Sequence, residues 1–150
     1  MKILIDADGC PVVRITEKTA CRHKIPCVIV CDSAHIFKSE YSEVVTADVG
    51  CDSTDMLLVN RAEKNDIVVT QDYGLAALCL SKGALALNQN GMIYSDKNID
   101  SLLFSRHVCK KARRAGKRIK GPSKRTPEQD QSFCDSLSKL INLNHTPMKA

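Results

Sequence analysis

Short apolar runs alternate with amphipathic segments along the first hundred residues of the chain. The runs predict buried strands, and the segments with apolar positions every three or four residues predict helices. The strands are expected at residues 2–7, 27–31, 43–47, 66–70 and 84–87, and the helices at residues 11–24, 53–65 and 73–82. Strands that are apolar on both faces and separated by helices are typical of a parallel sheet covered on both sides. We therefore expect an α/β fold, a three-layer α/β/α sandwich with a mostly parallel central sheet.

The last third of the chain has a different pattern. Residues 98–115 predict a helix with a basic C-terminal half, and residues 117–125 predict a basic loop. A final helix begins after Thr126, because Pro127 suits the first helical position and Gln129 completes a capping box with Thr126. The sequence thus predicts one domain over residues 1–150. It has an α/β core at residues 1–97 and an extension of basic C-terminal helices at residues 98–145, which packs on that core.

Composition narrows the class of protein. Apolar residues make up 43% of the chain, which is ordinary for a globular protein. No apolar run approaches the roughly 18 residues that span a bilayer, so we expect no membrane partner. The apolar N-terminal run is interrupted at Asp6, before it could form a signal peptide, which predicts a cytoplasmic protein.

The chain has eight cysteines and no CxxC pair, which favours reduced thiols over disulfides in a cytoplasmic protein. Most of them are expected to be small buried apolar residues. Cys10 lies beside Asp6 and Asp8, whose charges should raise the pKa of its thiol. A raised pKa argues against a nucleophilic role for Cys10.

The net charge of +5 is unevenly distributed. Residues 101–127 contain ten Lys or Arg and no Asp or Glu, whereas the rest of the chain has a net charge of −5. Such segregation predicts a polyanionic partner, here nucleic acid, although a solvated helix face is the alternative. Three Tyr, three Phe and no Trp argue against a base-stacking platform. The candidate nucleic-acid-binding residues are Arg106, Lys110, Lys111, Arg113, Arg114, Lys117, Arg118, Lys120, Lys124 and Arg125.

Aspartates follow the predicted strands. Asp6 and Asp8 end the first strand, and because they are two positions apart they point the same way in extended backbone. Asp72 follows the fourth strand within two residues. Since ligands bind beyond the carboxyl ends of parallel strands, we expect these three carboxylates to share a site.

Other aspartates have a second interpretation. Asp52 and Asp55 stand at the start of a predicted helix, where they are either part of the same site or only helix caps. Asp32 and Asp48 also follow strands, and a cap or turn role is expected for both.

Clustered carboxylates repel one another unless some are protonated or a cation neutralises them. Oxygen ligands of this kind suit Mg²⁺ or Mn²⁺, and the chain has no His and Cys set that matches a zinc site. A divalent ion in such a site can hold a phosphate and activate water for phosphodiester hydrolysis.

Four segments carry a resemblance to a known family. DADGCPV (6–12), DVGCDSTD (48–55), VVTQDYGLAALCLSKGALALN (68–88) and RHVCKKARRAGKRIKGPSKRT (106–126) resemble the YaiI/YqxD family of uncharacterised bacterial proteins. That family is placed in the PIN-like group of nuclease folds. The resemblance implies an α/β/α sandwich that binds Mg²⁺ or Mn²⁺ and cuts RNA.

The resemblance also implies roles for single residues. Asp6 matches the first-strand acid, Asp55 the helix-start acid and Asp72 the fourth-strand acid of PIN-like enzymes. Asp8 and Asp52 match acids within the family's own motifs. Gly9 stands where the family form DADACP has Ala, a departure that removes no ligand.

The leading hypothesis is therefore a metal-dependent ribonuclease in which Asp6, Asp52, Asp55 and Asp72 hold the metal and Asp8 binds it or orients the attacking water. A haloacid-dehalogenase-like phosphatase is a second hypothesis, because ILIDADG resembles that family's first motif, with Asp6 as nucleophile and Asp8 as acid and base. Cys10 stands where that motif usually has Thr or Val. A non-catalytic nucleic-acid-binding protein is the third. The oligomeric state is left open.

Overall fold

The computed structural model describes residues 1–33, 37–47, 53–114, 116 and 124–144. Its helices and strands include all those that the sequence predicted, in the same order. They are β1 (Ile3–Asp6), α1 (Val13–Arg22), β2 (Cys27–Asp32), β3 (Glu43–Ala47), α2 (Ser53–Arg61), β4 (Ile67–Val69), α3 (Tyr73–Ser81), β5 (Leu85–Leu87), β6 (Ile93–Tyr94), α4 (Ile99–Arg114) and α5 (Pro127–Asn144).

The strands form one sheet in the order β3-β2-β1-β4-β5-β6. All neighbours pair in parallel except β5 and β6, which are antiparallel. The chain leaves β1 toward β2 on one side and later returns to β4 on the other side, so the strand order reverses between β1 and β4. In open parallel sheets a crevice for ligands forms at such a point, beyond the carboxyl ends of the strands.

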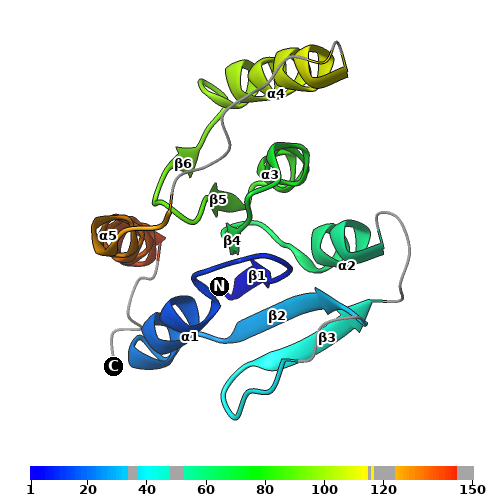
Figure 1. Ribbon diagram of the computed structural model, residues 1–150. Coiled ribbons are helices and arrows are strands. Elements are labelled where there is room, and N and C mark those ends of the chain that lie inside the picture. The colour runs from blue at the N-terminus through cyan, green and yellow to red at the C-terminus, as the bar shows by residue number, and fades with distance from the viewer. Residues whose placement is uncertain (34–36, 48–52, 115, 117–123, 145–150) are drawn as a thin grey trace.

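Helices cover both faces of the sheet, as Figure 1 shows: α1 and α5 lie on one face, and α2, α3 and α4 lie on the other. The alternation of side chains along β1 sends Ile3 and Ile5 to the first face and Leu4 to the second, and all three are fully buried. The predicted three-layer α/β/α sandwich is therefore confirmed. Among the described residues, no helix is long and apolar enough to cross a membrane.

The C-terminal helix α5 contributes to the core of the first face. Phe133, Leu137 and Ile141 recur every four residues along α5 and are fully buried against this face. The predicted capping box is present, because the Thr126 amide donates to Gln129 Oε1 at 2.9 Å and the Gln129 amide donates to Thr126 Oγ1 at 3.4 Å. These contacts fix where α5 begins, next to the β5–β6 turn.

Two details differ from the sequence prediction. The helix expected over residues 53–65 ends at Arg61, because Asn65 adopts φ +71° and the Asp66 carboxylate accepts the Glu63 amide at 2.9 Å. Strand β6 was not predicted, since two residues are too short to show an alternating pattern.

Candidate functional site

Thr70, at the end of β4, joins two of the predicted site residues. Its hydroxyl donates to Asp6 Oδ2 at 2.8 Å, and its oxygen accepts the Asp72 amide at 3.0 Å. The Thr70 residue is only 1% exposed, so this bridge is buried. Asp6 and Asp72, 66 positions apart in the chain, are thereby held beside the same hydroxyl. The sequence prediction missed Thr70, whose only signal is a polar residue at the end of an apolar strand.

Asp72 also caps helix α3. Its Oδ1 accepts the amides of Gly74 at 2.9 Å and Leu75 at 3.2 Å. A Cβ at position 74 would lie 3.3 Å from Asp72 Oδ1, so glycine leaves room for the capping carboxylate. The sequence prediction had assigned Asp72 only to the shared site. The structure adds a capping role that fixes the orientation of this carboxylate.

Asp8 is anchored to the neighbouring strand. It accepts the Asp32 amide through Oδ2 at 3.1 Å, so the backbone beyond β1 is tied to the end of β2. This bond places Asp8 and Asp32 at the carboxyl edge of the sheet, as the parallel arrangement predicted.

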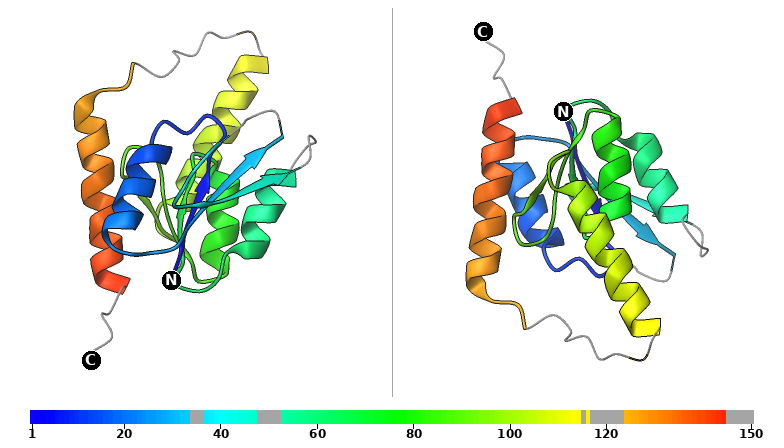
Figure 2. Two further views of the ribbon diagram at one scale, coloured as in Figure 1. Left: turned by 90° about the horizontal axis from the view of Figure 1, so that it is seen from below. Right: turned by 90° about the horizontal axis from the view of Figure 1, so that it is seen from above.

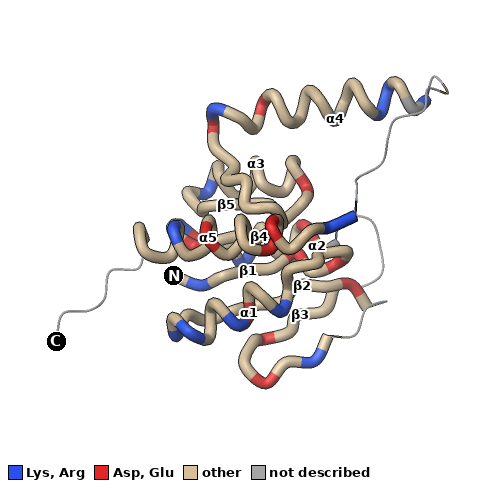
Figure 3. The backbone as a smooth tube through the Cα atoms, turned by 60° about the vertical axis from the view of Figure 1, so that its left-hand side comes forward, with Lys and Arg blue, Asp and Glu red and all other residues tan. Residues whose placement is uncertain are grey.

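Three other aspartates of the predicted site lie close enough to Asp6 for their charges to act on its carboxylate. The pKa of Asp6 is raised from 3.8 to about 6, chiefly by burial, and further by the charges of Asp55, Asp72 and Asp8, while the Thr70 hydrogen bond opposes the shift. Burial raises the pKa of the Cys79 thiol to about 11, with further contributions from Asp6 and Asp55. Asp55 at the start of α2 therefore faces the same region as Asp6 in β1. Figure 3 shows acidic segments from separate parts of the chain gathered beside β4 and α2.

The geometry of this acidic site is looser than a finished metal centre. Within the described ranges, no three His, Cys, Asp or Glu side chains form a group that could hold a metal ion. Asp48 and Asp52, which the sequence analysis also considered, lie outside the described residues. The structure thus brings Asp6, Asp8, Asp55 and Asp72 together electrostatically around the end of β1.

The predicted basic segment divides into parts with different surroundings. On α4, Lys110, Lys111 and Arg114 line a surface pocket together with His107. In both views of Figure 2 the C-terminal half of α4 extends on the side toward which the β2 arrow points. Arg106 and Arg113 belong to α4, Lys124 is exposed, and Lys117, Arg118 and Lys120 lie outside the described residues.

Arg125 is held within the fold. Its Nε donates to Asp130 Oδ1 at 2.6 Å, its Nη1 to Asn90 Oδ1 at 2.8 Å and its Nη2 to the Gln89 carbonyl at 2.6 Å. This network fastens the β5–β6 turn to the start of α5. A nucleic-acid role for Arg125 stays a prediction, and its observed contacts are structural.

The cysteines of the described residues are unpaired, and Cys51 lies outside these residues. The pKa of the Cys10 thiol is raised, as predicted, but burial is the larger cause and the Asp6 charge the smaller one, while Arg125 opposes them. A thiol held in its neutral form is a poor nucleophile.

Comparisons with known proteins place the chain in a family. The sequence model described as "Uncharacterized BCR, YaiI/YqxD family" matches residues 4–143. A UPF0178 protein of Ruminiclostridium cellulolyticum is 52% identical over 141 residues, which are 94% of this chain and 92% of that protein. A UPF0178 protein of Clostridium acetobutylicum is 48% identical over 143 residues, 94% of this chain and 97% of that protein. No solved structure matches the chain. The family predicted from the four sequence segments is therefore confirmed, and the chain belongs to the YaiI/YqxD family of bacterial proteins.

Proposed function

We propose that this protein is a divalent-metal-dependent nuclease that hydrolyses phosphodiester bonds of RNA. The observation that carries the proposal is the state of Asp6. A partly buried carboxylate whose pKa is raised to about 6, chiefly by burial and in part by the charges of three other carboxylates, lies in a region of negative potential. Such a region attracts a cation, and it lies where the strand order reverses between β1 and β4.

The donor chemistry of the acidic site fits Mg²⁺ or Mn²⁺, because all four side chains offer carboxylate oxygens. Asp6, Asp55 and Asp72, with Asp52 as a further ligand, would hold the ion. A divalent ion bound there would stabilise charge on a phosphoryl oxygen and lower the pKa of a bound water. A metal held in this way at the carboxyl edge of the sheet is what the resemblance to PIN-like enzymes implies.

The surrounding residues would position these ligands. The Thr70 hydroxyl holds Asp6 Oδ2, and the amides at the start of α3 hold Asp72 Oδ1, so both carboxylates are oriented before any ligand arrives. Asp8, which follows β1 and is held by the Asp32 amide of the neighbouring strand β2, would orient the attacking water. Such prior orientation lowers the cost of reaching the reactive geometry.

The basic face of α4 would hold the RNA strand. Lys110, Lys111 and Arg114 line one pocket and can neutralise phosphates without reading sequence. The C-terminal half of α4 lies on the side of the molecule toward which β2 runs (Figure 2). A bound RNA strand could therefore pass from α4 toward the acidic site.

Incubation of the protein with labelled single-stranded RNA in Mn²⁺ or Mg²⁺, and in parallel with EDTA, tests the proposal. The key variant is Asp6→Asn/Asp72→Asn. Asn at position 6 keeps an acceptor for Thr70, and Asn is as good a helix cap as Asp, so the variant should fold. The matched control is Asp96→Asn/Asp100→Asn, which makes the same change in charge at two exposed aspartates.

Metal-dependent cleavage by the wild type and the control, lost in the key variant, is the expected result. Salt-sensitive RNA binding without cleavage in any metal would refute the nuclease and favour a binding protein. Release of phosphate from small phosphomonoesters, with an aspartyl-phosphate at Asp6, would refute it in favour of a phosphatase.

A further inference from the structure

Phe104, on helix α4, is an aromatic residue that the core does not use. It is 68% exposed and belongs to neither of the two hydrophobic clusters of the described residues. Most of the other aromatic rings are buried or pack against these clusters: Phe37, Phe133, Tyr73 and Tyr94. Tyr41 is partly exposed, and its hydroxyl donates to the Ile25 carbonyl. A single exposed apolar residue is ordinary, so the surroundings of Phe104 decide what it can bind.

The side chains around Phe104 form one row along α4. Positions 104, 107, 108, 111 and 114 recur every three or four residues, so they lie on one face of the helix. All five residues are exposed. We call this row the α4 stripe; it comprises Phe104, His107, Val108, Lys111 and Arg114. An apolar end, made of Phe104 and Val108, therefore continues into basic side chains.

The basic end of the α4 stripe is open to an anionic ligand. Its three basic residues line the α4 pocket together with Lys110. Within the described ranges, no carboxylate is paired with any of these four side chains, and residues 101–127 contain no Asp or Glu at all. Unpaired cations gathered on one face favour a polyanion.

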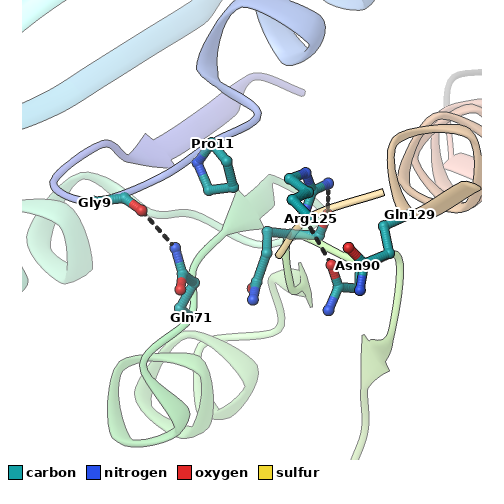
Figure 4. A pocket seen from close by; sticks show the side chains of 7 residues that line it. Gly9, Pro11, Gln71, Asn90, Arg125 and Gln129 are labelled. Atoms are coloured by element: carbon teal, nitrogen blue, oxygen red, sulfur yellow. Dashed lines mark hydrogen bonds between the residues drawn. The ribbon is translucent and has the colours of Figure 1, made fainter. Parts of the chain in front are cut away.

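The second surface pocket, drawn in Figure 4, has a different character. Its lining includes Gln71, Gln89, Gln129 and Arg125. Arg125 is the one charged side chain among the described lining residues, and its guanidinium is already bonded to Asp130 and Asn90. Gln71 donates to the Gly9 carbonyl at 2.9 Å. These bonds hold segments of the fold together, so the described lining of this pocket has no unpaired cation for an RNA phosphate, in contrast to α4.

We propose that the α4 stripe binds RNA as a single strand, with one base stacked on the ring of Phe104 and the adjoining phosphates on Lys111 and Arg114. Proteins that hold single strands without reading sequence combine basic side chains with aromatic rings on which bases stack. In a duplex each base is already stacked between its neighbours, so the ring favours single strands. One ring takes one base, which differs from the multi-base platform that the composition argues against. This inference rests on the proposed function, because it names the class of RNA that reaches the acidic site.

Other occupants suit the α4 stripe less well. A second copy that packed through the same face would bring two sets of cations together, with no carboxylate in residues 101–127 to offset them. A membrane surface would require a wide apolar face, whereas Phe104 and Val108 are the two large apolar side chains that α4 exposes. A single strand needs only one ring beside several cations.

Tryptophan fluorescence measures stacking at position 104 directly. The chain has no Trp, so Phe104→Trp introduces the one indole of the protein. In EDTA, where no metal-dependent cleavage occurs, single-stranded RNA should quench most of the indole fluorescence, and inorganic polyphosphate, which has no bases, should leave it unchanged. The matched control is Leu143→Trp, at a residue of α5 that is 70% exposed and lies on the other side of the sheet. Its fluorescence should not respond to RNA.

Affinity supplies the second readout. Phe104→Leu keeps an exposed apolar side chain with good helix propensity and removes the ring, so its Tm should match that of the wild type. Its affinity for single-stranded RNA should fall about tenfold, while its affinities for polyphosphate and for duplex RNA of the same sequence stay the same. Phe104→Tyr, which retains an aromatic ring, should bind single-stranded RNA like the wild type.

The outcomes separate this inference from the proposed function. RNA binding without quenching overturns the inference, and so does polyphosphate binding that weakens as much as RNA binding in Phe104→Leu. A dimer that Phe104→Leu dissociates, or a spectral shift of the indole with anionic phospholipid vesicles and none with RNA, also overturns it, since a second copy or a membrane would then be the occupant.

The test does not depend on cleavage. Quenching by RNA, together with the weaker binding of Phe104→Leu, supports the inference even if no metal supports cleavage, a result that would refute only the proposed function. Cleavage in Mn²⁺ with unchanged RNA affinity in Phe104→Leu would leave the nuclease standing and overturn the stacking role.

Discussion

The partly buried charge of Asp6 should lower the stability of the protein at neutral pH. The pKa of Asp6 is about 6 in the folded state against 3.8 ordinarily. Between these values the folded state binds more protons than the unfolded state, so stability falls as pH rises from about 4 to about 6. A shift of about two pKa units corresponds to about 3 kcal/mol in the free energy of unfolding. This contribution is present below pH 3.8 and has been lost by pH 7.

The variant Asp6→Asn removes this charge and keeps an acceptor for the Thr70 hydroxyl. We expect its free energy of unfolding at pH 7.5 to exceed that of the wild type by up to about 3 kcal/mol. For a chain of 150 residues this corresponds to a rise in Tm of roughly 6–12 °C. Near pH 3.5 the two proteins should melt at similar temperatures, because Asp6 is then protonated in the folded state and mostly protonated in the unfolded state.

Thermal unfolding followed by circular dichroism at several pH values, in EDTA and a reducing agent, measures this difference. Asp96→Asn, at an exposed aspartate, is the control and should change stability by less than about 0.5 kcal/mol. A difference between Asp6→Asn and wild type that does not depend on pH, or a variant less stable at pH 7.5, would refute the burial and repulsion assigned to Asp6. Mn²⁺ at one hundred times its dissociation constant should raise the stability of the wild type by about 2.7 kcal/mol, and that of the variant by much less.

Three further predictions concern other parts of the fold. Gly91→Ala should lower the free energy of unfolding by about 3 kcal/mol in chemical denaturation, because φ is +87° and the new Cβ would lie 2.5 Å from the Ser132 carbonyl oxygen. The control Gly9→Ala, at φ +71° with no atom within 4 Å of the new Cβ, should lower it by only about 1 kcal/mol. Equal losses in the two variants would contradict this account. Asp66→Asn should lower the free energy of unfolding by about 3 kcal/mol, because the buried Asp66 carboxylate accepts hydrogen bonds from the Lys2 ammonium at 2.7 Å and the Lys2 amide at 3.0 Å. A loss below about 1 kcal/mol would contradict this structural role. Neutralising three basic residues of α4 should reduce the slope of log K against log salt for RNA binding by about 2, whereas neutralising three exposed lysines elsewhere should not. The first set is Lys110, Lys111 and Arg114, and the control set is Lys18, Lys97 and Lys139.

Local sequence signals were sufficient for most of the fold. Apolar strands separated by helices predicted the parallel sheet, and the capping box at Thr126 and Gln129 located the start of α5. Errors arose where a tertiary contact decided the outcome. Helix α2 stops at Arg61 because the Asp66 carboxylate, itself bound to the Lys2 backbone, takes the Glu63 amide.

The acidic site was accessible to prediction because its residues follow the strands of a parallel sheet, whose carboxyl ends must meet. Asp6 and Asp72 could be paired in this way without knowledge of any contact. By contrast, a pocket lined by Gln71, Gln89 and Gln129 could not be predicted, because these residues belong to two separate loops and to helix α5 and come together only in the fold. Thr70 shows the same limit, since its polar end-of-strand position did not reveal that it binds Asp6.

Two of the proposed contacts with RNA would respond to different solution variables. Contacts between the basic side chains of α4 and RNA phosphates weaken steeply as the salt concentration rises. Cation binding at Asp6 weakens as this carboxylate is protonated, near pH 6. RNA binding in Mn²⁺ that keeps its pH dependence in the α4 variant, while the slope of its salt dependence falls by about 2, would therefore separate the two contacts in a single protein.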